Sequence, residues 1–138
     1  MSETTMPPVV PGTFGWNEIV TSNSEKSAKF YAELFGWTTE VMEMPGGVQY
    51  TTFKQGDVPV GGCVQPPNLE EGFTPMWLPY INTEDIDASV EKSKKLGASV
   101  ITERTDLPIG SFAVISDPLG ATFAFWQDNP NSPCPSES

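Results

Sequence analysis

The sequence contains no histidine, and this absence excludes more chemistry than any other feature of its composition. Histidine is the usual acid–base group near neutral pH, the base of most nucleophilic triads and the commonest metal ligand. Ser-His-Asp catalysis, Cys-His catalysis and His-based zinc or iron sites are therefore all removed. Any catalysis must use carboxylates, hydroxyls or a thiol.

Basic residues are also scarce, with 7 Lys and Arg against 18 Asp and Glu and a net charge of -11. The resulting negative field repels phosphate backbones and anionic membrane surfaces. No stretch approaches the roughly 20 apolar residues of a membrane-spanning helix, and the first dozen residues lack the features of a signal peptide. We therefore expect a cytoplasmic protein that binds neither nucleic acid nor membrane.

Cysteine is nearly absent as well, because only Cys63 and Cys134 occur. Two cysteines are too few for a disulfide scaffold or a structural zinc site, which favours a reducing compartment, although pairing between them stays open. The 138 residues suit one hydrophobic core. We expect a single domain over residues 12–127, with a disordered N-terminal segment at 1–11 and a disordered Pro- and Ser-rich tail at 128–138.

An internal repeat organises this domain. A β-like run beginning at Trp16 precedes a helical pattern ending at Gly36, and a run beginning at Trp77 precedes one ending at Gly97, so both pairs are 61 residues apart. Three further short β-like runs follow each helical pattern. The sequence thus predicts two βαβββ modules, at 12–65 and 76–127, joined by a linker at 66–75.

Periodicity and turn residues place the elements of each module. Ser22 is expected to start the first helix as the N-cap of a capping box with Glu25, and Gly36 to end it. The expected strands are 13–21, 37–43, 48–54, 58–65, 76–82, 98–103, 111–116 and 121–127, and the second helix is 84–96. The expected inward-facing helix residues are Phe30, Tyr31, Leu34, Phe35, Ile86, Val90 and Leu96.

Three motifs occur in order along the chain: KFYAELFGW at 29–37, EDIDA at 84–88 and SDPLG at 116–120. Together with the repeat they resemble the vicinal oxygen chelate superfamily of glyoxalases, bleomycin-resistance proteins and extradiol dioxygenases. The resemblance implies an α+β fold in which tandem βαβββ modules form a curved mixed sheet around a cleft, with the helices outside. It also implies a homodimer, because family members of this length commonly pair.

The resemblance further implies metal ligands on the first and fourth strands of each module. The corresponding positions here are Trp16 or Asn17, Cys63, Trp77 or Leu78, and Ala124. None is His or Glu, and Trp, Leu and Ala supply no ligand atom. We therefore expect no metal, no cofactor, and neither glyoxalase nor ring-cleaving activity.

Alternation along the strands predicts which side chains face the cleft. Ile19, Phe123 and Phe125 are expected to face the helices, and the cleft is expected to receive Trp16, Glu18, Val20, Cys63, Gln65, Thr122, Ala124 and Trp126. The candidate ligand-binding residues are Trp16, Tyr50, Thr52, Cys63, Trp77, Tyr80 and Trp126. Tryptophans would stack on a flat ligand and hydroxyls would orient it, while the alternative that these side chains are simply core stays open.

Glu18 is the one acidic residue in the first strand and the candidate catalytic group. Burial would raise its pKa toward a value useful for proton transfer. Three functions are compatible with the sequence: metal-free binding of a small aromatic or hydrophobic molecule, a metal-independent lyase or isomerase with Glu18 as general base, and a non-catalytic interaction module. Binding is favoured, because a lone carboxylate without an acid partner or oxyanion donor is little equipment for an enzyme.

Overall fold

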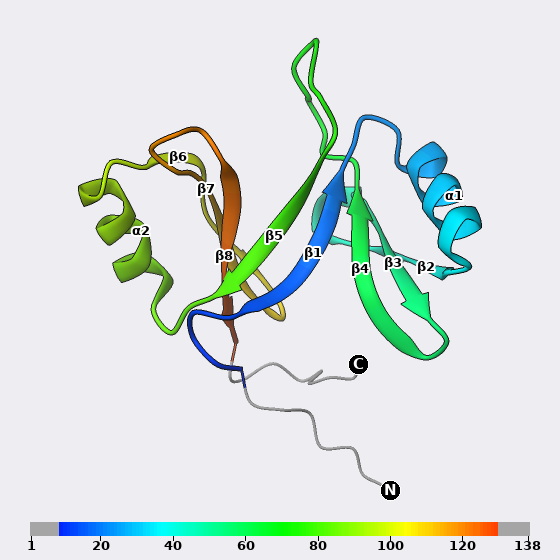
Figure 1. The fold of residues 1–138 in the computed structure, drawn as a ribbon, viewed down its shortest axis with the longest axis horizontal. Coiled ribbons are helices and arrows are strands. Elements are labelled where there is room, and N and C mark those ends of the chain that lie inside the picture. Colours follow the sequence, from blue (N-terminus) through cyan, green and yellow to red (C-terminus); the bar gives the residue numbers. More distant parts are fainter. Residues whose placement is uncertain (1–8, 130–138) are drawn as a thin grey trace, which may run out of the picture. The chain divides into compact units, whose positions relative to one another are not determined.

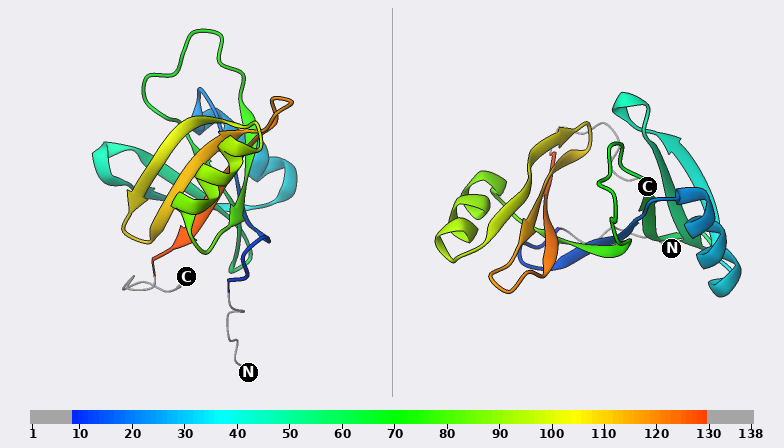
Figure 2. Two further views of the ribbon diagram at one scale, coloured as in Figure 1. Left: turned by 90° about the vertical axis from the view of Figure 1, so that its left-hand side faces the viewer. Right: turned by 90° about the horizontal axis from the view of Figure 1, so that it is seen from above.

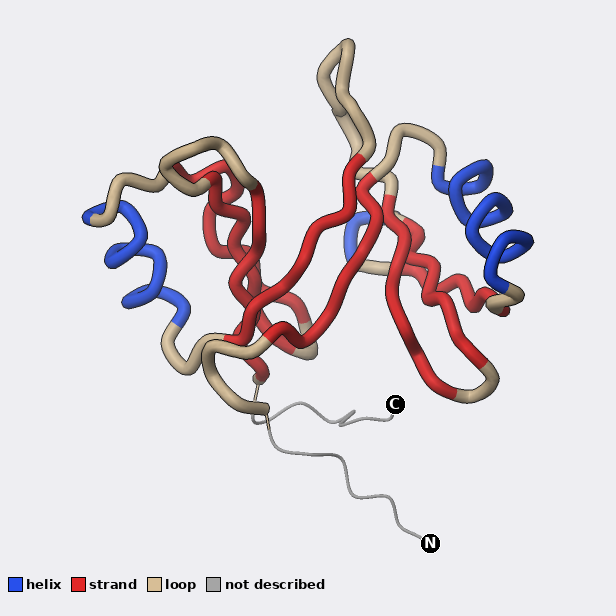
Figure 3. Tube along the Cα trace, viewed as in Figure 1, coloured by secondary structure: helices blue, strands red, loops and turns tan. Residues whose placement is uncertain are grey.

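The computed structural model describes residues 9–129, and all the predicted helices and strands are present within them (Figures 1 and 3). The first module contains β1 (Phe14–Val20), α1 (Ser24–Phe35), β2 (Thr38–Glu43), a short 3-10 turn (Pro45–Gly47), β3 (Gln49–Gln55) and β4 (Val58–Val64). The second contains β5 (Met76–Asn82), α2 (Ile86–Lys95), β6 (Ser99–Leu107), β7 (Gly110–Ser116) and β8 (Thr122–Asp128). Most of the two terminal segments predicted to be disordered, including Cys134, lies outside the described residues.

The strands form an eight-stranded mixed sheet that is not closed, in the order β2-β3-β4-β1-β5-β8-β7-β6. Within each module the last strand returns beside the first, so β1 pairs with β4 and β5 with β8 in parallel, while the other mapped pairs are antiparallel. The predicted fold class is therefore confirmed. The chain divides into two compact units, Trp16–Pro79 and residues 9–15 with 80–129.

In the unit Trp16–Pro79, α1 lies over one face of the strands (Figure 2). The core beneath it consists of Ile19, Phe53 and Cys63, and the partly buried Ala28, Tyr31 and Trp37 pack against them. Of the four residues of α1 that were expected to face inward, Tyr31 does so. The expectation is wrong for the other three, which are more than half exposed: Phe30, Leu34 and Phe35.

In the other unit, α2 packs more tightly on its strands. Ile86 and Val90 are buried as expected, in a cluster with Ala113 and Ile115. The expected helix-facing side chains Phe123 and Phe125 pack against the same cluster. Leu96 was expected to face inward but is 68% exposed, because it is the C-cap residue beyond the last helical turn. In the described part of the chain, neither helix is long and apolar enough to cross a bilayer.

Both helices begin with the same pair of contacts. Asn23 Oδ1 accepts a hydrogen bond from Lys26 N at 3.0 Å, and Asp85 Oδ1 accepts one from Ala88 N at 3.1 Å. The expected N-cap Ser22 is therefore wrong by one residue. Asn23 takes the role because its backbone is extended while the chain turns helical after it.

A glutamine at the end of each module's last strand completes the helix start. Gln65 Oε1 accepts from Ser24 N at 3.0 Å, and Gln127 Oε1 accepts from Ile86 N at 2.7 Å. These side chains satisfy backbone N–H groups that have no partner within the helix. Gln65 was expected to face the cleft, and this contact with α1 corrects that expectation.

These matched contacts give the repeat an offset of 62 residues, not the expected 61, at the helix start and in the paired strands of each module. The hydroxyl pair Thr21–Ser27 recurs as Thr83–Ser89 with the same shift. The difference arises in the helices, because Gly36 follows Asn23 by 13 residues and Gly97 follows Asp85 by 12. In structural terms Trp16 therefore matches Leu78, not Trp77.

We expect Gln127→Ala to lower the free energy of unfolding by about 1–2 kcal/mol, because the backbone N–H of Ile86 loses its acceptor at a buried position. Urea denaturation followed by circular dichroism measures the change. Gln55→Ala, at the exposed end of β3, is the matched control and should stay within about 0.5 kcal/mol of the parent. Equal stabilities for the two variants would contradict the capping role.

Candidate functional site

Three side chains in the unit Trp16–Pro79 form a hydrogen-bonded chain on the sheet face away from α1. Trp16 Nε1 donates to Tyr50 Oη at 2.7 Å, and Tyr50 Oη donates to Glu18 Oε1 at 3.0 Å. Trp16 and Glu18 share a face because they are two residues apart in β1. Tyr50 reaches them from β3, across the intervening strand β4.

Gly62 makes this crossing possible. It lies opposite Glu18 in the β1–β4 pairing, and a Cβ at this position would overlap the hydroxyl of Tyr50. Any side chain here would push the phenol away from the carboxylate. Gly62 is thus a site residue that the sequence reasoning missed, although the glycine pair inside a predicted strand was a usable signal.

The direction of the hydrogen bonds follows from the chemistry of the donors. An indole N–H can only donate, so Tyr50 Oη accepts from Trp16 and sends its own proton to Glu18. Burial, followed by the negative charge of Glu18, raises the pKa of Tyr50 far above its usual value. The phenol therefore stays protonated, and it holds the 7%-exposed Glu18 carboxylate as an acceptor.

Cys63 does not join this group, and its expected direction is wrong. It pairs with Ile19 one residue beyond Gly62, so it faces α1, where its Sγ lies 3.7 Å from the carbonyl oxygen of Ser24. Burial, with a smaller effect from the charge of Glu18, raises the pKa of the thiol to about 11. Cys63 is a protonated core side chain at neutral pH.

Trp77 lies on the side of α1 as well. Its Nε1 donates to Tyr31 Oη at 3.1 Å, and the two rings meet edge to face at 5.1 Å. Thr52, in contrast, lies opposite Gly62 in the β3–β4 pairing and shares the face of Glu18. The structure therefore brings together Trp16, Glu18, Tyr50 and Thr52, and separates them from Cys63 and Trp77.

The remaining candidates belong to the unit of residues 80–129. Tyr80 lies 6.3 Å from the rings of both Phe112 and Trp126, and Trp126 Nε1 donates to Asp128 Oδ1 at 2.5 Å. With the 62-residue offset, Tyr80 takes the place of Glu18, and Phe112 that of Tyr50. Module two thus has an aromatic cluster at the positions that Glu18 and Tyr50 occupy in module one.

The metal that the family resemblance implies does not fit these residues. Within residues 9–129, no three Cys, Asp and Glu side chains lie close enough to hold an ion. Of the two fourth-strand positions where the resemblance implies metal ligands, Cys63 has a ligand atom and Ala124 has none. Cys63 faces away from Glu18. Trp16 donates its N–H to Tyr50, and Tyr50 donates its O–H to the carboxylate, so both side chains turn donors, which a cation cannot use, toward their neighbours.

Comparison with known proteins finds similarity along most of the chain. Residues 13–125 match the model of the Glyoxalase/Bleomycin resistance protein/Dioxygenase superfamily. The chain is 39% identical over 120 residues to "Putative glyoxylase CFP32" of Mycobacterium tuberculosis, covering 86% of this chain and 45% of that protein. It is 35% identical over 130 residues to "Anthracycline biosynthesis protein DnrV" of Streptomyces peucetius, covering 85% and 47%.

The chain thus spans less than half the length of these curated relatives. Among solved structures, the protein BH1468 from Bacillus halodurans has a TM-score of 0.63 at 14% identity, covering 92% of this chain and 99% of that one. This likeness concerns the fold. Since the family model covers residues 13–125, the chain belongs to the glyoxalase/bleomycin resistance protein/dioxygenase superfamily.

Proposed function

We propose that this protein binds a small aromatic or hydrophobic molecule without a metal, on the face that carries Trp16, Glu18 and Tyr50. The observation that carries the proposal is the hydrogen-bonded chain of these three residues. It holds the indole in one orientation, and a fixed aromatic ring offers a large contact area at little cost in conformational entropy. The carboxylate beside it can accept a hydrogen bond from the ligand.

The names of the Streptomyces relatives support a flat ligand. Anthracyclines contain fused planar rings, and such rings stack well on an indole. The polar pair beside the indole suits the hydroxyl groups of a ligand of this kind. A planar polycyclic molecule bearing hydroxyl groups is therefore our first choice of ligand class.

A second candidate function is a metal-independent lyase or isomerase with Glu18 as general base. The Tyr50 hydrogen bond favours it, because it fixes the orientation of the Glu18 carboxylate, as a general base requires. Tyr50 would then act as a positioning residue for Glu18. Binding remains our first proposal, because the acid beside this base is the Tyr50 phenol, whose pKa is raised far above its usual value and which is therefore a poor proton donor to a substrate.

Replacing the indole tests the binding proposal. We expect Trp16→Ala to weaken binding of an anthracycline probe about ten- to hundred-fold, in line with the roughly 1–3 kcal/mol of one stacking contact. Fluorescence titration measures the affinity. Trp77→Ala is the matched control, because Trp77 packs against Tyr31 on the α1 side and should leave the affinity unchanged.

Circular dichroism must show that both variants are folded. An equal loss of affinity in the two variants would contradict stacking on Trp16. If Trp16→Ala alone unfolded the protein, the indole would belong to the core, and the milder Trp16→Phe variant would then have to retain probe binding for the proposal to stand.

Replacing the carboxylate separates the two candidate functions. Glu18→Gln keeps the shape of the side chain and removes the base. For a binding protein we expect the probe affinity to stay within a few-fold of the parent. For an enzyme, turnover of a ligand recovered by native mass spectrometry should fall about 10²- to 10⁴-fold while binding persists.

We also propose that the protein is a homodimer. Phe30, Leu34 and Phe35 expose more than half of their apolar surface on α1, and β2 is an edge strand with all six residues exposed. Such surfaces favour association. Sedimentation equilibrium at micromolar concentration should give twice the 15.0 kDa chain mass, and a monomer would contradict the proposal.

A further inference from the structure

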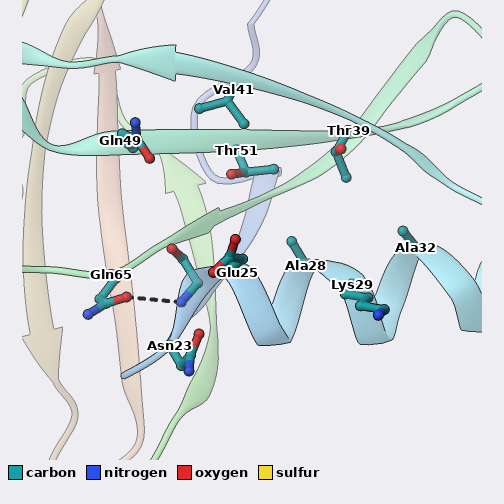
Figure 4. A pocket seen from close by; sticks show the side chains of 11 residues that line it. Asn23, Glu25, Ala28, Lys29, Ala32, Thr39, Val41, Gln49, Thr51 and Gln65 are labelled. Carbon is teal, nitrogen blue, oxygen red and sulfur yellow. Dashed lines mark hydrogen bonds between the residues drawn. The ribbon is translucent and has the colours of Figure 1, made fainter.

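A groove of about 540 Å³ lies between α1 and the strands β2 and β3, on the sheet face opposite the Trp16–Glu18–Tyr50 chain (Figure 4). One wall is the inner side of α1, the other is formed by the two strands, and one end is closed by the contact between Gln65 and Ser24 N. The lining residues are Asn23, Ser24, Glu25, Ala28, Lys29, Ala32, Thr39, Val41, Gln49, Thr51 and Gln65.

The second module shows what usually fills this space. The 62-residue offset matches Ser24 with Ile86 and Ala28 with Val90, and both residues of α2 are buried in its core. It also matches Cys63 with Phe125, whose ring packs against that core. Module one thus has small side chains at three positions where module two has large apolar ones.

Thr51 is the polar group at the floor of the groove. Its side chain hangs from β3 toward α1, and the residue is only 7% exposed (Figure 4). Its hydroxyl forms no hydrogen bond with any of residues 9–129. In module two the matching residue, by the pairing with Phe125, is the fully buried Ala113, which has no polar group to satisfy.

A buried hydroxyl without a partner costs free energy, and a ligand can supply the missing hydrogen bond. The groove offers apolar surface from Ala28, Ala32 and Val41, and neutral amide groups from Gln49 and Gln65. Its two charged residues, of opposite sign, are both exposed and lie on the helix: Glu25 and Lys29. Nothing at the floor would neutralise a charged ligand.

We propose that this groove is a second ligand site, separate from the face of Trp16, for a compact uncharged molecule with an apolar body and one amide or hydroxyl group. The apolar body takes the space that Ile86 and Val90 fill in module two, where module one has the groove-lining Ser24 and Ala28. The polar end exchanges a hydrogen bond with Thr51. The site is independent of the proposed function, because its lining residues face the other side of the sheet.

Cyclohexanecarboxamide is a suitable probe, since its non-planar ring stacks poorly on an indole. Titration followed by two-dimensional NMR should give saturable shifts at the backbone amides of residues 24–32 and 49–51. Cyclohexanecarboxylate, with the same ring and an anionic end, should bind at least ten-fold more weakly. Shifts confined to Trp16 and its neighbours, or no saturable shifts, would overturn the proposal.

Two variants locate the site. Thr51→Val keeps the shape of the side chain but removes the hydroxyl, and should weaken probe binding about five- to ten-fold. Ala28→Val copies Val90 and should abolish binding while the thermal midpoint stays at or above that of the parent. Thr102→Val, on β6 and not part of the groove, is the matched control and should bind as the parent does. Unchanged affinity in a folded Thr51→Val variant would overturn the proposal.

Discussion

The parallel pairing of β1 with β4 decides which side chains can meet in the unit Trp16–Pro79. Its register puts Glu18 opposite Gly62 and Ile19 opposite Cys63, so these neighbours go to opposite faces of the sheet. On one face, the missing side chain of Gly62 lets Tyr50 reach Glu18. On the other face, Ile19 and Cys63 pack beneath α1. If the register of β1 on β4 shifted by one residue, each of these side chains would move to the opposite face, and neither the hydrogen-bonded chain nor the core beneath α1 could form.

The fold could be predicted from the sequence because its signals are local and repeated. β5 was predicted at 76–82 and observed at Met76–Asn82, since turn-forming residues bound a run of strand-forming ones. The helix start was harder, because Ser22 and Asn23 are both good caps. The contact of Gln65 with Ser24 N depends on a strand 41 residues away, which no local pattern reveals.

The candidate site was predicted less well, for two physical reasons. The face of each strand residue depends on register, and a fourth strand containing two adjacent glycines gives no apolar alternation around Cys63 to set it. Trp77 was aligned with Trp16 by residue type, but the shorter distance from Asp85 to Gly97 shifts the repeat by one. Glu18 and Tyr50 were both identified as candidates from the sequence. Their contact depends on Gly62, because any side chain at this position would occupy the space of the Tyr50 hydroxyl.

The two modules show how one backbone frame can carry different chemistry. On one face of the sheet, Glu18, Tyr50 and Gly62 of module one correspond to Tyr80, Phe112 and Ala124 of module two. On the other face, module one has a groove between helix and sheet where module two has a filled core. The donors around Glu18 matter most for its chemistry. An indole N–H and a protonated phenol can orient a carboxylate, but neither can join it in coordinating a cation. A ligand that brings its own hydrogen-bond donor therefore suits this carboxylate better than a metal ion does.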